Sequence, residues 1–126
     1  MTIRVLSEGW RNQYDRMRRA RTGLVRAHRA GDQYDDAFYH AVQDAWHLRD
    51  WIGKDTTLSR QLRADICREA EENEAIGIVG DLAMGSGRMT PEFMVAMKNG
   101  ESRSGIVILD GANRAWDEIL TRYKLL

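Results

Sequence analysis

Residues 34–52 contain the longest clean helical pattern in the chain. At 100° per residue, six apolar side chains of this segment fall within about 80° of one another: Tyr34, Phe38, Ala41, Ala45, Leu48 and Ile52. Val42 and Trp46 widen this apolar face, so the helix needs more than one packing partner. We therefore expect an amphipathic helix of about five turns, around which the other elements pack.

The flanking segments also have helical periodicity. The pattern predicts a helix over 8–30, ended by Gly31, and a last helix over 114–123. Between them, Asp55, Thr56 and Thr57 form a cap cluster before a helix over 58–73. The acidic residues that end this helix are unfavourable at a helix C-terminus, which predicts a break and a separate helix over 74–84.

The segment before the last helix supports two interpretations. Threonine, proline and glutamate at 90–92 are typical of a helix start. In contrast, Asn99-Gly100 is a hairpin turn signal, and a β-branched run follows it. The second interpretation is favoured: a β-hairpin of roughly 93–98 and 104–109, followed by a turn and an N-cap at Asn113 for the last helix.

The chain is long enough for one hydrophobic core. It has 126 residues, of which 43% are hydrophobic and 30% are charged, as in globular proteins. We predict a mainly α fold, a single domain over 1–126 that forms a compact bundle of four to five helices with a small β-hairpin. The first two helices should be antiparallel because their connection is short. The expected core is Trp10, Tyr14, Met17, Leu24, Phe38, Ala41, Ala45, Leu48, Ile52, Leu62, Ile66, Ile76, Val79, Leu82, Ile108, Trp116 and Leu120.

The cysteine content and the apolar runs bear on the compartment. The single cysteine, Cys67, excludes an internal disulfide and favours a reducing environment. The longest apolar run, 75–80, is far too short to span a membrane, and the N-terminus has no signal-peptide pattern. We therefore expect a cytoplasmic protein that does not associate with a membrane.

The charge is neutral in total but unevenly distributed. Residues 1–31 contain eight arginines and two acidic residues, a net of +6, and the remainder therefore carries −6. Such a segment could bind nucleic acid or an acidic partner. Its candidate contacts are Arg11, Arg18, Arg19, Arg26 and Arg29. The favoured alternative is that these arginines pair with acidic helices of the same chain or of a second subunit.

Two short motifs resemble those of a family of small, largely uncharacterised bacterial and phage helical proteins. The first, HLxDW, is present as His47-Leu48-Arg49-Asp50-Trp51, and the second, similar to DLANGSKH, begins at Asp81. The second departs from the family at Met84, where the family has asparagine, and at Gly87-Arg88, where it has lysine and histidine. The resemblance implies a signature of His47, Asp50, Trp51 and Asp81, and the loss here of any chemistry that the lysine and histidine perform.

The helical composition of that family is similar to the HEPN superfamily by fold analogy, and active HEPN proteins are often ribonucleases with an Arg-x4–6-His motif. Arg21 and His28 are two helical turns apart and share a face. In a metal-independent ribonuclease the histidine could move a proton and the arginine could stabilise phosphorane-like charge. The favoured alternative is that both lie at a helix seam, paired to acidic residues of the third helix.

A row of acidic residues and histidines lies on one flank of the central helix. Its members, Asp36, His40, Asp44 and His47, fall within about 80° of one another. Di-iron bundles need a Glu-x-x-His on each of two helices, and this row contains a single Asp-x-x-His. We therefore predict neither a metal site nor another cofactor.

These observations rank three functional hypotheses. The first is a small non-enzymatic accessory protein, encoded by a phage or mobile element, that binds a protein partner or itself as a homodimer or other homo-oligomer. The second is a HEPN-like metal-independent ribonuclease or toxin. The third is a structural component of a phage particle.

Overall fold

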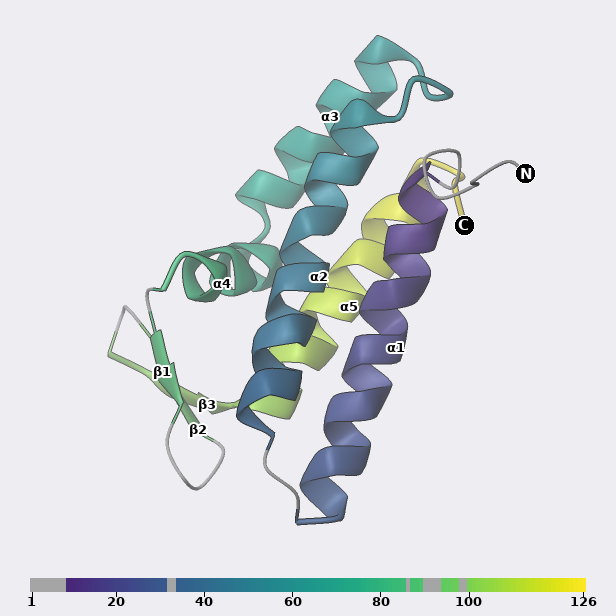
Figure 1. Ribbon diagram of the computed structural model, residues 1–126. Helices are drawn as coiled ribbons and strands as arrows, with labels where there is room; N and C mark the ends of the chain where they lie inside the picture. The colour runs from purple at the N-terminus through teal and green to yellow at the C-terminus, as the bar shows by residue number, and fades with distance from the viewer. Residues whose placement is uncertain (1–8, 32–33, 86, 90–93, 98–99) are drawn as a thin grey trace, which may run out of the picture.

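The computed structural model describes residues 9–31, 34–85, 87–89, 94–97 and 100–126, which form five helices and a three-stranded sheet (Figure 1). Along the chain these are α1 (Gly9–Arg29), α2 (Asp35–Lys54), α3 (Arg60–Glu72), α4 (Glu74–Ala83), β1 (Gly87–Met89), β2 (Met94–Met97), β3 (Ser102–Ser104) and α5 (Gly105–Arg122). This confirms the mainly α bundle with a small β-hairpin. None of the helices in these residues is long and apolar enough to cross a bilayer.

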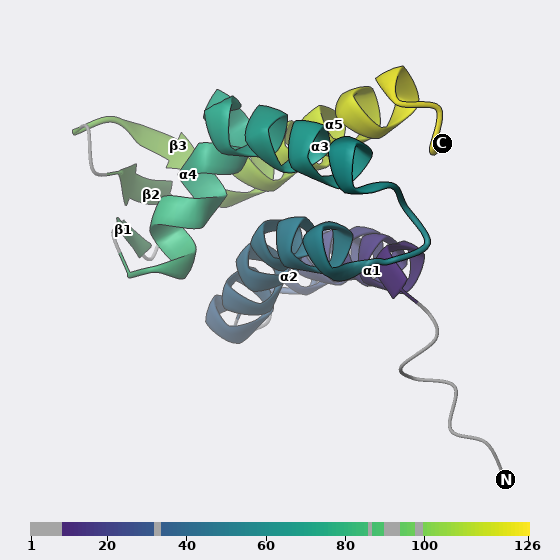
Figure 2. The same ribbon diagram turned by 90° about the horizontal axis from the view of Figure 1, so that it is seen from above.

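The helices form two layers, with α1 and α2 in one and α3, α4 and α5 in the other (Figure 2). The central position predicted for α2 is confirmed, because α2 contacts each of the other four helices. Its residues Ala41, Ala45, Leu48 and Ile52 have no exposed surface. Burial of a leucine or isoleucine side chain contributes about 1.5–3 kcal/mol, so this face provides much of the stability of the core. As expected from the short connection, α1 and α2 are antiparallel (Figure 1).

Close packing on α2 explains why α4 contains glycine in its interior. A Cβ added at Gly80 would lie 2.7 Å from the ring of Trp46, so any larger residue would displace this indole. The break that the acidic run predicted before α4 is also present. Asn73 ends α3, and its side chain then accepts a hydrogen bond from the Ile76 backbone N–H at the start of α4.

The sheet is antiparallel and has the order β1-β2-β3. Val95 pairs with Met89 on one side and Arg103 on the other, and its side chain is buried in the core. The backbone N–H of Met97 donates to the Glu101 carbonyl, which closes the hairpin between β2 and β3. Part of the predicted hairpin is therefore present, whereas the helix start at 90–92 lies outside the described residues.

The predicted strand over 104–109 is wrong. These residues begin α5, which starts at Gly105 rather than after an N-cap at Asn113. Ile108, Leu109, Ala112 and Trp116 are buried along one face, and this helical spacing overrides the β-propensity of the branched run. Asn113 lies in the middle of α5, and its Nδ2 donates to the Leu109 carbonyl within the core.

The predicted core is buried except for Tyr14, Leu62 and Leu82, which are partly buried and pack against it. The sequence did not indicate that Gln13 is buried, with 3% of its surface exposed. Its Nε2 donates to the Asp44 carbonyl at 3.0 Å, which joins α1 to α2. This hydrogen bond offsets the free energy that burial of the amide costs.

Candidate functional site

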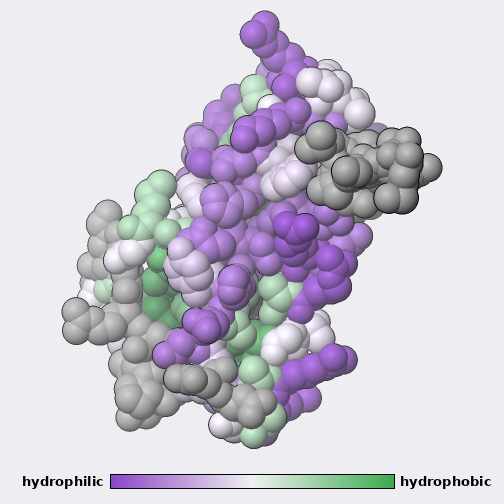
Figure 3. Space-filling model, in the orientation of Figure 1, coloured by the Kyte–Doolittle hydropathy of each residue, from purple (hydrophilic) through white to green (hydrophobic). Residues whose placement is uncertain are grey.

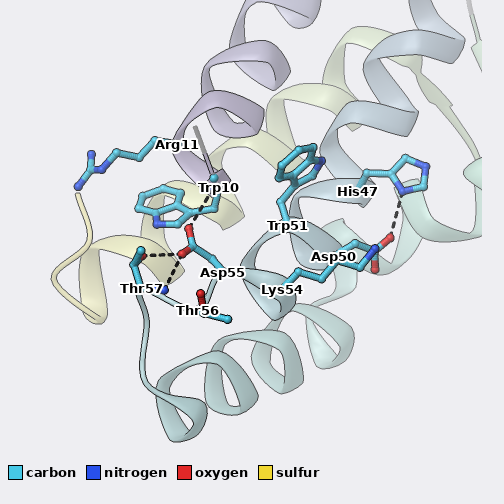
Figure 4. A pocket seen from close by; sticks show the side chains of 10 residues that line it. Trp10, Arg11, His47, Asp50, Trp51, Lys54, Asp55, Thr56 and Thr57 are labelled. Carbon is cyan, nitrogen blue, oxygen red and sulfur yellow. Dashed lines mark hydrogen bonds and ion pairs between the residues drawn. The ribbon is translucent and has the colours of Figure 1, made fainter. Parts of the chain in front are cut away.

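A cleft of about 880 Å³ lies at one end of the bundle, between the first turn of α1 and the last turns of α2 (Figure 4). One wall is the face of α2 that carries His47, Asp50, Trp51 and Lys54, at helical spacings of three and four residues. The remaining lining comes from the start of α1 and the α2–α3 turn: Gly9, Trp10, Arg11, Asp55, Thr56 and Thr57. The three residues of the HLxDW signature that the resemblance singled out on α2 therefore lie in one cleft.

Asp55 joins the two sides of the cleft. Its Oδ2 accepts a hydrogen bond from the Trp10 backbone N–H at 3.3 Å, and its Oδ1 accepts from the backbone N–H and hydroxyl of Thr57 at 2.9 and 2.5 Å. Burial alone raises the pKa of Asp55, but the hydrogen bonds from Thr57 and Trp10 outweigh it and lower the pKa. The carboxylate is thus held ionised at the positive end of α1.

The predicted role of the Asp55 cluster is therefore wrong. Asp55 does not cap α3; the N-cap of α3 is Ser59, whose hydroxyl accepts from the Leu62 backbone N–H. Asp55 instead binds an N–H group of α1, which is distant in sequence. Gly9 makes this approach feasible because its φ is +58° and a Cβ there would lie 2.5 Å from the Asp55 Oδ2.

His47 and Asp50 belong to a network on the rim of the cleft. The His47 Nδ1 lies 3.2 Å from the Asp50 carboxylate, and its Nε2 lies 2.9 Å from the Gln43 side-chain oxygen. Arg49 bridges Asp50 and Glu71 at 3.3 and 3.1 Å. The Asp50 carboxylate is therefore shared between two cationic or proton-donating side chains.

The cationic groups of the cleft are less engaged than its carboxylates. Within the described residues, Lys54 has no hydrogen-bond or ion-pair partner. Arg11 lies 4.8 Å above the Trp10 ring and donates one hydrogen bond to the Leu125 carbonyl, which leaves other guanidinium donors available. A ligand in the cleft would therefore meet accessible positive charge next to the half-buried Trp51 ring.

Arg21 and His28 lie outside this cleft and have different neighbours. The Arg21 Nε is 2.6 Å from the Asp110 carboxylate of α5, so its acidic partner is on α5 and not on the third helix as expected. The His28 ring packs edge-to-face on Tyr34, with ring centroids 5.5 Å apart, beside the α1–α2 connection. The ribonuclease hypothesis that rested on this pair stays a prediction.

The polar row of α2 does not converge on one point. His40 is exposed beside Tyr39, with ring centroids 6.2 Å apart, and Asp44 faces Gln13 instead. His47 is engaged by Asp50 as described above. In the part of the chain that the structure describes, no group of three or more histidine, cysteine or acidic residues is placed to hold a metal ion.

The arginines of α1 divide into two groups. Arg18 joins α5 through a 2.9 Å ion pair with Asp117, a residue that also accepts a 2.5 Å hydrogen bond from the Tyr14 hydroxyl. Burial and this hydrogen bond raise the pKa of Tyr14. Arg18 and Arg21 therefore follow the interpretation in which the arginines pair with acidic residues of the same chain, whereas Arg11 donates to the Leu125 carbonyl. The side chains of the second group, Arg16, Arg19, Arg26 and Arg29, are exposed and have no partner among the described residues.

Comparison with protein-family models, curated proteins and solved structures finds no match. The family resemblance and its signature therefore stay predictions. The fourth signature residue, Asp81, is exposed on α4 and does not line the cleft.

Several cleft residues were not identified from the sequence. Trp10 was assigned only to the core and Asp55 only to a helix cap, and Lys54 was assigned to no predicted element. The spacing of Lys54 from His47, Asp50 and Trp51 was a usable signal, because it places all four on one face of α2. The position of Trp10 depends on the packing of α1 on α2 and has no local signal.

Proposed function

We propose that the protein is a non-enzymatic accessory protein that binds an acidic segment of a protein partner in the cleft between α1 and α2. The observation that supports this proposal is the state of the charges in the cleft. Its carboxylates, Asp50 and Asp55, are engaged by neighbouring groups, whereas Lys54 and most donors of Arg11 are available. The accessible charge therefore favours a ligand with carboxylates.

The aromatic residues favour a peptide over a small inorganic anion. Trp51 is half-buried and offers an apolar surface, whereas Trp10 is buried and packs beneath the Arg11 guanidinium. Interfaces between proteins gain most of their binding free energy from a few such anchors, surrounded by polar contacts. The cleft volume of about 880 Å³ fits a few residues of an extended chain.

Selection from a library of displayed random peptides tests this proposal. We expect enrichment of sequences that combine an acidic residue with an aromatic or aliphatic one. Calorimetric titration of a selected peptide should give at least a tenfold weaker Kd for Trp51→Ala and for Lys54→Glu, because tenfold corresponds to about 1.4 kcal/mol. The matched control is Arg26→Glu, the same charge change on an exposed residue at the other end of α1.

The Lys54→Glu variant also distinguishes charge recognition from a folding defect. A folded Lys54→Glu protein should prefer peptides in which the acidic residue is replaced by lysine. Enrichment of peptides without acidic residues, or an equal loss in Arg26→Glu, would contradict the proposal. If the occupant is instead a second copy of the chain, sedimentation will show a dimer that Trp51→Ala dissociates.

A further inference from the structure

The outer face of α1 carries a second cationic surface, separate from the cleft, which we call the arginine row. It consists of Arg16, Arg19, Arg26 and Arg29, all exposed and without a hydrogen-bond or ion-pair partner among the described residues. At 1.5 Å per residue the row is about 20 Å long. Figure 3 shows hydrophilic residues along this outer side of the molecule.

The composition of this face argues against a protein partner. At 100° per residue the arginine row spans about 140°, and the positions between its members are also polar or small: Asn12, Asp15, Thr22 and Gly23. Protein interfaces need a buried apolar centre, which this face lacks. A polyanion is bound by phosphate contacts and requires no such centre.

The side-chain type and the geometry favour a nucleic-acid duplex. The guanidinium of arginine binds phosphate oxygens through two parallel hydrogen bonds. Arg19 and Arg26 lie near the middle of the row, and Arg16 and Arg29 lie on opposite sides of it, so the helix can contact phosphates on both sides of a groove. Gly23 lies about halfway along the length of the row, and a Cβ there would meet nothing within 4 Å, so this part of α1 is not crowded by neighbouring elements.

We propose that the arginine row docks α1 on the phosphate backbone of duplex DNA, along the major groove and without reading the sequence. The major groove of B-DNA is about 12 Å wide and admits an α-helix, whereas that of duplex RNA is too narrow. Single strands are bound through aromatic stacking, and the arginine row contains no aromatic residue. This surface does not depend on the cleft, so either proposal can fail without the other.

Fluorescence anisotropy with two unrelated 30-base-pair DNA duplexes tests the proposal. Four phosphate contacts give a slope of log K against log salt of about −3.6, so binding should weaken about 150-fold between 50 and 200 mM salt. The double variant Arg19→Gln/Arg26→Gln removes two contacts. Its slope should fall to about −1.8, which corresponds to a weakening of about 12-fold over the same range.

Two further variants separate the arginine row from net charge and from folding defects. Arg60→Gln/Arg114→Gln removes the same charge from exposed arginines of α3 and α5 and should bind DNA with an affinity and salt slope close to those of the unchanged protein. Asp15→Asn removes the one carboxylate on the face and should tighten binding several-fold. A damaged fold cannot produce this gain.

Four results would overturn the proposal. These are no binding at 50 mM salt, equal losses in the two double variants, no gain in Asp15→Asn, and tighter binding to single-stranded DNA or duplex RNA. Binding of acidic polypeptides such as polyglutamate, without binding of DNA, would assign the row to a protein partner instead. Circular dichroism of each variant confirms that the helical content is unchanged.

Discussion

Replacement of Asp55 tests whether the two sides of the cleft are joined as the structure indicates. Asp55→Ala removes the acceptor for the Trp10 backbone N–H and the single oxygen that accepts both hydrogen bonds from Thr57. Loss of a helix-capping acceptor costs about 1 kcal/mol. Loss of the partly exposed hydrogen bonds to Thr57 adds about 1 kcal/mol in total. We therefore expect the free energy of unfolding to fall by about 2 kcal/mol, measured by urea denaturation followed by circular dichroism.

The pH dependence identifies the contribution of the charge. The folded pKa of Asp55 is below its ordinary value of 3.8, so its stabilisation is complete above that pH and is lost as the pH falls through the folded pKa. Asp55→Asn keeps one oxygen acceptor but loses the charge at the start of α1. It should therefore cost about 1 kcal/mol at neutral pH. The difference in free energy of unfolding between the Asp55→Asn variant and the unchanged protein should become smaller as the pH is lowered from 5 to 3.

A double-mutant cycle with Gly9 tests the geometry. Gly9→Ala places a Cβ 2.5 Å from the Asp55 Oδ2 and forces alanine into a positive φ. The positive φ alone costs about 1–2 kcal/mol in either background. The remaining cost, due to the contact with the carboxylate, should disappear when Asp55 is already alanine.

The explanation is refuted if Asp55→Ala changes stability by less than about 0.5 kcal/mol, the range of ordinary surface substitutions. It is also refuted if the Asn variant differs from the unchanged protein by the same amount at pH 5 and pH 3. Other carboxylates titrate equally in both proteins, so they cancel in this difference. If the effects of Gly9→Ala and Asp55→Ala on the free energy of unfolding are additive, the two residues are not in contact, which would also refute the explanation.

Two packing predictions use the same denaturation assay. Gly80→Ala should destabilise the protein by about 1–3 kcal/mol through its clash with Trp46, whereas the control Gly77→Ala, which meets no neighbour within 4 Å, should be neutral or stabilise α4 by up to about 1 kcal/mol. Equal effects would contradict the close packing. Trp116→Phe should lower the free energy of unfolding by about 2–3 kcal/mol, because it leaves a cavity and removes the 2.9 Å hydrogen bond from the indole N–H to the Ala45 carbonyl. A decrease of less than about 1 kcal/mol would contradict this role of Trp116.

The helices that the sequence predicted well are those whose apolar stripes are continuous. α2 has such a stripe, and its bounds differ from the prediction by one residue at the start and two at the end. The break between α3 and α4 was also predictable, because acidic residues oppose the helix dipole there and Asn73 is a good N-cap. The apolar stripe, the acidic C-terminal turn and the N-cap are local properties, so they can be read directly from the sequence.

The start of α5 was not predictable from local signals. Ile106, Val107 and Ile108 favour a strand, and Asp110-Gly111 and Asn113 resemble a turn and a cap. The helix forms because its apolar face is buried against α2 and α4. This stabilisation comes from tertiary packing and overrides the local preference for a strand. The error also hid Asp110, the partner of Arg21, which the prediction placed in a turn and not in α5.

The same reasoning separates the two candidate surfaces. The arginine row follows from helical spacing within α1 and could be predicted from the sequence, although the division between paired and unpaired arginines could not. The cleft requires α1 to lie beside the end of α2, with Asp55 binding the Trp10 backbone N–H across 45 residues of sequence. Local patterns place Lys54 and Trp51 on one face of α2, but only the tertiary fold places Trp10 opposite them. A protein partner in this cleft would therefore require a folded bundle, whereas DNA binding by the arginine row requires only that α1 remain helical.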